Sequence, residues 1–165
     1  MKLIATGLSL SWAATAALII AHSQAAEPVT DERQASNACA NGQMAWLLRS
    51  GYNSGNPCSE RGGIAKIRRV ARLLVGRDSY ELYDFTYSFL AAVVRHGGAR
   101  LLVLKNGRYA GLYDDDAAGG KWHVLGSRAS VTWPETGAVT AIDFSAGPPD
   151  SIQVGDGGFT FFEKR

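Results

Sequence analysis

The chain has 165 residues, of which 46% are hydrophobic, 19% are charged and 10% are aromatic, and its formal net charge is +2. This length fits one compact domain, and the composition excludes disordered, collagen-like and coiled-coil chains. The nearly balanced charge gives no support for a general affinity for nucleic acid.

The first segment has the layout of a secretory signal peptide. Lys2 is its only charge, and an apolar stretch runs from there to Ala21. The small residues Ser23 and Ala25 then meet the requirement of signal peptidase, so we expect a leader at residues 1–25 and no stable membrane span after its cleavage. The alternative is an uncleaved anchor, because the uncharged run is about long enough to cross a bilayer. In both cases the rest of the chain is expected outside the cytoplasm, in the periplasm or secreted.

The two cysteines of the chain, Cys39 and Cys58, both follow the predicted leader. In an oxidising compartment they can form a single intramolecular bond, and we expect that disulfide. Their spacing matches neither a redox motif nor a zinc site, so no cofactor is expected.

A polar lead-in is predicted at residues 26–34, followed by one β-rich domain at residues 35–165. The domain is expected to begin with a short helix, because apolar residues recur at helical spacing up to Ser50. Ser36 or Asn37 is available as the N-cap of this helix.

Residues 64–75 fit two different periods. On a helix, most of the apolar residues share one face and the four basic residues share the other. On a strand, alternate residues from Ala65 to Val75 share a face, with Arg69 as the exception. The β-branched content and the short link to the next segment favour a strand, while a basic amphipathic helix stays open as the alternative.

From Tyr80 onward the pattern predicts strands joined by short links. Residues 83–89 alternate as a half-buried strand does, and the run is expected to turn at residues 96–98. Asn106-Gly107 lies between two apolar runs and predicts a type I′ hairpin. Five further strands are expected at residues 121–125, 130–133, 139–144, 151–154 and 159–163.

These elements predict a mainly β (α+β) fold with a short N-terminal helix tied by one disulfide. Many strands with short links indicate an antiparallel β-meander. Because an open sheet of this size would leave two apolar edges exposed, we expect a barrel-like or sandwich arrangement.

Candidate catalytic residues are few. His96 is the better candidate for a general acid or base, because the two glycines after it let backbone amides approach a ligand. His123 is the other histidine after the leader. A catalytic histidine would need a carboxylate partner, and Asp84, Glu135 and Asp143 are the candidates.

Asp114 and Asp116 could supply oxygen ligands to a calcium ion. Consecutive acidic residues after a strand more often form a solvated turn, and the EF-hand spacing is absent. We therefore expect no bound metal.

Basic and aromatic residues are the candidates for binding a partner. Aromatic rings on one face of a sheet can stack on sugars or anchor a protein, and a basic cluster can complement an acidic partner. The candidate binding residues are Arg68, Arg69, Arg72, Tyr109, Tyr113 and Trp122.

We expect a non-catalytic binding or interaction domain of the cell envelope, of the inhibitor, immunity or accessory type, because no catalytic motif is found. Its partner is expected to be an envelope protein or a glycan. Two alternatives stay open: a small hydrolase that uses His96 with a carboxylate, and a small-ligand carrier with an apolar cavity inside a barrel.

Overall fold

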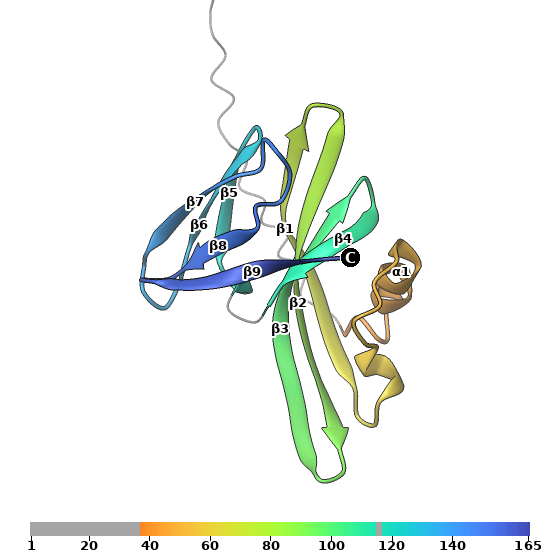
Figure 1. The fold of residues 1–165 in the computed structure, drawn as a ribbon. Helices are drawn as coiled ribbons and strands as arrows, with labels where there is room; N and C mark the ends of the chain where they lie inside the picture. Colours follow the sequence, from red (N-terminus) through yellow and green to blue (C-terminus); the bar gives the residue numbers. More distant parts are fainter. Residues whose placement is uncertain (1–36, 115–116) are drawn as a thin grey trace, which may run out of the picture.

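The computed structural model describes residues 37–114 and 117–165, which fold almost entirely into antiparallel strands (Figure 1). The predicted leader and lead-in lie outside the described residues. Within the described part, helix α1 (Gln43–Ser50) and the 3-10 helix η1 (Pro57–Ser59) precede nine strands. The strands are β1 (Ile64–Val75), β2 (Asp78–Ala91), β3 (Val94–Lys105), β4 (Arg108–Tyr113), β5 (Lys121–Leu125), β6 (Arg128–Thr132), β7 (Val139–Asp143), β8 (Ser151–Val154) and β9 (Gly158–Lys164).

The strands form two antiparallel sheets that curve into a half-barrel. Six strands pair in the order β1-β2-β3-β4-β9-β8, and three pair in the order β5-β6-β7. Strand β1 lies beside β5, and β7 lies beside β8, so the smaller sheet faces the curved larger one (Figure 1). The predicted mainly β, antiparallel fold with one short helix and one disulfide is confirmed.

The ambiguous segment 64–75 is strand β1, which pairs with β2 along its length. Its register shifts at a bulge between Arg69 and Ala71. Because a bulge adds one residue, Val70 and Ala71 are both buried and the simple alternation is broken. This interruption is why the apolar residues of the segment also fit a helical period.

Two apolar cores lie on opposite faces of the larger sheet. The inner core fills the space between the two sheets, and it includes Phe144, Tyr113 and Trp133. The outer core lies between α1 and the outside of β1–β4, and it includes Leu47 and Phe85. The large sheet therefore buries both of its faces where α1 covers it.

The expected turn at residues 96–98 is wrong. Strand β2 continues to Ala91, the chain turns at Ala92 and Val93, and β3 begins at Val94. Ala92 adopts a left-handed conformation, with φ 56°. Glycines 97 and 98 lie inside β3, where small residues permit a close approach of two backbones.

The predicted hairpin at Asn106-Gly107 is confirmed. Both residues have positive φ, 51° and 77°, as a type I′ turn requires. Helix α1 begins later than expected, at Gln43, with Gly42 before it and no side-chain cap. Asn37 instead binds other backbone groups, since its side chain accepts hydrogen bonds from the N–H of Cys39 (3.1 Å) and of Ala65 (3.4 Å).

Candidate functional site

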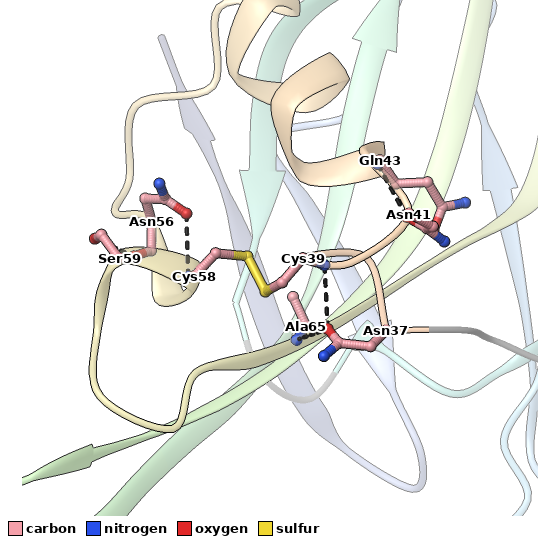
Figure 2. Close-up of a disulfide and its surroundings, with 8 residues drawn as sticks. All are labelled: Asn37, Cys39, Asn41, Gln43, Asn56, Cys58, Ser59 and Ala65. Atoms are coloured by element: carbon pink, nitrogen blue, oxygen red, sulfur yellow. Dashed lines mark hydrogen bonds between the residues drawn. A yellow bond between two sulfur atoms is a disulfide. The ribbon is translucent and has the colours of Figure 1, made fainter.

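The expected disulfide between Cys39 and Cys58 is present, and it fixes the segment that follows α1 (Figure 2). Its Cα atoms are 5.4 Å apart. The side chain of Asn56 accepts a hydrogen bond from the N–H of Cys58 (3.1 Å), which holds the start of η1. The disulfide therefore ties the loop at residues 52–60 to the turn that precedes α1. Through η1, the same loop also lies beside β1 and β2.

Five rings form a continuous row that begins in the loop after α1 and continues along β2 to β3, and we call them the aromatic row: Tyr52, Phe85, Tyr87, Phe89 and His96. Neighbouring ring centroids along the row are 5.6, 5.4, 6.4 and 5.8 Å apart. The row begins in the outer core, where Tyr52 and Phe85 are buried, and passes through the half-buried Tyr87 and Phe89 to the exposed His96. It is therefore an apolar surface that emerges gradually from the core.

A pocket of about 220 Å³ lies between the loop at residues 52–60 and the aromatic row, and we call it the aromatic pocket. Its apolar wall is formed by four rings of the row together with Pro57. Its polar wall includes Ser54, Asn56 and the exposed Glu60. In the described part of the chain, the Glu60 carboxylate has no ion-pair partner, so the rim carries an available negative charge.

Arg100 on β3 contacts three residues that line the pocket. Its guanidinium donates hydrogen bonds to the hydroxyl of Tyr52 and to the carbonyl of Ser54, both at 3.1 Å, and lies 5.4 Å from the ring centroid of Tyr87. Its Nε is 3.4 Å from a carboxylate oxygen of Asp114. Arg100 therefore connects the loop, the aromatic row and the end of β4.

Burial raises the pKa of Tyr52, and the hydrogen bond from Arg100 opposes this effect. The phenol therefore stays neutral at physiological pH, and its hydroxyl donates to the carbonyl of Ser54 (3.2 Å). Because the neutral phenol is hydrogen-bonded to both Arg100 and Ser54, Tyr52 has a structural role in the wall of the aromatic pocket.

The predicted basic cluster is largely compensated by acidic residues on the next strand. Arg68 pairs with the buried Asp84 at 2.6 Å. Arg69 and Arg72 both approach Glu81, at 3.5 and 4.0 Å. Sequence alone did not reveal these pairs, because strand register and not sequence distance brings the partners together.

The three aromatic residues that the sequence suggested for binding lie inside the protein. Tyr113 and Trp122 belong to the inner core, and Tyr109 belongs to the outer core. The hydroxyl of Tyr113 donates to the carbonyl of Pro149 (2.7 Å). Tyr113, Trp122 and Tyr109 are 0%, 7% and 6% exposed. Because these side chains are packed in the cores, they form no part of the exposed aromatic surface.

The candidate catalytic residues are not brought together. His96 is exposed and stacks on Phe89, and His123 is exposed on β5. Among the described residues, neither histidine forms a hydrogen bond or an ion pair with a carboxylate. Of their candidate partners, Asp84 is bound to Arg68, and Asp143 accepts a hydrogen bond from the N–H of Ser145 (2.8 Å).

The candidate metal ligands are only partly described. Asp114 lies beside Arg100, and Asp116 falls outside the described residues. No group of three or more histidine, cysteine or acidic residues that could hold a metal ion occurs in the described ranges.

The residues of the aromatic pocket were mostly missed as site candidates, although a signal for them exists in the sequence. Phe85, Tyr87 and Phe89 recur at every second position, which places three rings on one face of a strand. What the sequence does not show is where α1 stops covering that face.

Searches against protein families, curated proteins and solved structures find no match. Within residues 37–114 and 117–165, no helix is long and apolar enough to span a membrane. The disulfide is compatible with an oxidising compartment outside the cytoplasm.

Proposed function

We propose that the protein is an exported, non-catalytic binding domain of the cell envelope, located in the periplasm or secreted, and that it holds its partner at the aromatic pocket. The observation that carries this proposal is the pocket itself, where half-buried rings face a polar loop with an available carboxylate. Apolar pockets with a polar rim are typical of sites that anchor a partner.

The size of the pocket supports an interaction domain over a carrier. Pockets that enclose small molecules usually measure about 300–1,000 Å³, whereas this one measures about 220 Å³. It can hold one apolar side chain of a larger partner. The inner core also fills the half-barrel with large side chains such as Trp133 and Phe144, where a carrier would need space.

The arrangement of the rings favours a protein partner over a glycan. The planes of Phe85 and Tyr87 differ by 26°, and those of Tyr87 and Phe89 differ by 8°. Neighbouring rings are therefore close to parallel along the strand, and because Tyr87 and Phe89 are half-buried, part of each ring is covered. A sugar stacks on an open ring face, whereas an aliphatic or aromatic side chain can also pack against ring edges.

The histidines support a binding role over a hydrolase. A general base needs a hydrogen-bonded partner to orient it, and neither histidine has a carboxylate partner in the described ranges. The Glu60 carboxylate at the rim is exposed, so its expected role is to attract a basic group beside the apolar anchor of the partner.

Capture with matched variants tests this proposal. The exported protein, purified with its disulfide formed, is immobilised and exposed to an extract of its own cell envelope. The wild type should retain one protein stoichiometrically. Tyr87→Ala and Phe89→Ala should weaken that retention roughly thirtyfold or more, as the loss of an interface anchor does.

The control is Phe161→Ala, since Phe161 lies on β9 and is 68% exposed. It should retain the partner as the wild type does, and circular dichroism should show that all variants are folded. Equal retention by the pocket variants would contradict the proposal. Release of the partner by soluble envelope glycan would assign the pocket to a glycan instead.

A further inference from the structure

The end of the β2–β3 hairpin projects beyond the rest of the sheet (Figure 1). Strand β1 pairs with β2 only as far as Ser88, and β4 pairs with β3 only from Leu101 onward. Within the described part of the chain, residues 89–96 therefore form a two-stranded ribbon with no further strand on either side. We call residues 90–95 of this ribbon the hairpin tip.

The hairpin tip is apolar and open to solvent. Val93 and Val94 are 93% and 57% exposed, and the neighbouring Ala91 and Ala92 are exposed too. Four consecutive apolar residues at a projecting end are costly to keep in water, which indicates that something covers them. The tip is convex, so it fits a soft or deformable medium better than a flat protein surface.

Two arginines lie at the same level behind the apolar end. Arg95 is opposite Leu90 in the hairpin register, and the N–H of Leu90 donates to the carbonyl of Arg61 (2.9 Å). In the described part of the chain, neither arginine pairs with a carboxylate. Their nearest neighbours in sequence with ionisable side chains are the exposed Glu60 and His96.

The spacing between the apolar end and the arginines matches a lipid surface. Arg95 is two positions after Val93, which at the usual rise of a strand is about 7 Å. Interfacial segments bury their apolar side about 5–10 Å into a bilayer. Insertion of the tip to this depth would bring Arg61 and Arg95 to the level of the phosphate headgroups.

We propose that the hairpin tip inserts into the surface of a bilayer that contains anionic phospholipids. The apolar end enters the acyl boundary, and the two arginines bind headgroup phosphates. This binding is peripheral and reversible, and it is independent of the partner held at the aromatic pocket.

Vesicle sedimentation tests the proposal with the exported, disulfide-bonded protein. It should bind vesicles of phosphatidylcholine and phosphatidylglycerol more tightly than vesicles of phosphatidylcholine alone, and added salt should weaken the binding. Val93→Asp should lower the partition coefficient roughly tenfold or more. Arg61→Gln and Arg95→Gln should each lower it about fivefold on the anionic vesicles.

Leu125→Asp is the matched control, because Leu125 is 73% exposed beside a different turn, between β5 and β6. It should bind vesicles as the wild type does. No binding by the wild type, or equal binding by Val93→Asp, would overturn the proposal. So would a wild-type dimer in solution that Val93→Asp converts to a monomer without any vesicle binding, because a second copy would then cover the tip.

Discussion

The carboxylate of Asp84 shows how one residue links the two sheets. It accepts hydrogen bonds from Arg68 (2.6 Å) and from the N–H of Gly119 (3.2 Å), which lies in the segment that leads to β5. Burial raises the pKa of Asp84, and these two donors oppose that effect. The cost of burying the charge therefore exceeds the compensation from its partners.

This balance predicts a dependence of stability on pH. A carboxyl group with a higher pKa in the folded state binds protons more tightly there, so it adds stability as the pH falls through that pKa and costs stability above it. In urea unfolding from neutral to mildly acidic pH, the free energy of unfolding of the wild type should rise relative to that of Asp84→Asn. A change in the opposite direction would show that the ion pair with Arg68 outweighs burial.

Gly97 is required for a close approach of two backbones in the hairpin that carries the aromatic row. A Cβ atom at this position would lie 2.6 Å from the carbonyl oxygen of Tyr87. Gly97→Ala should therefore destabilise the protein by about 1–3 kcal/mol, as measured by urea unfolding. Gly157→Ala is the control, because a Cβ atom there would meet nothing within 4 Å. Equal stability of the two variants would contradict this account.

At the scale of elements, the disulfide stabilises the loop at residues 52–60, which forms one wall of the aromatic pocket. It joins residues that are 19 positions apart. Its loss should lower the free energy of unfolding by about 3 kcal/mol, because the unfolded chain gains conformational entropy without the cross-link. Urea unfolding of the wild type and of the double variant Cys39→Ser/Cys58→Ser measures this cost. Unchanged stability would mean that the outer core alone holds α1 in place.

Most elements could be predicted from the sequence where a single period applies. The alternation at residues 83–89 and the Asn106-Gly107 turn identify their strands directly. The bulge in β1 mixes two periods, which left residues 64–75 ambiguous. The turn expected at residues 96–98 was misplaced, because glycines inside a strand resemble glycines in a turn until the partner strand is known.

The candidate site was harder to predict than the elements, since it depends on which part of a sheet face stays uncovered. The periodic rings of β2 indicate a face, but Phe85 is buried while Phe89 is half-buried. Tyr109 and Trp122 are also aromatic residues on strands, yet they fill the cores. Tertiary packing assigns these roles, and no local pattern distinguishes them.

For the whole molecule, the decisive feature is that the six-stranded sheet contributes residues to both cores, while its β2–β3 hairpin extends beyond them. Helix α1 covers the outer face near β1 and β4, while the β2–β3 hairpin continues past it (Figure 1). The aromatic pocket lies where the outer core ends, and the hairpin tip lies further along the same ribbon. Both proposed binding surfaces thus follow from the length of a single hairpin.

Hydrogen exchange with and without the captured partner tests the central claim most directly, because it maps the contact over the whole chain. We predict slower exchange at residues 52–60 and 85–89, which form the aromatic pocket, and unchanged exchange in β5–β7. Protection of β5–β7 with unchanged exchange at the pocket segments would contradict the account.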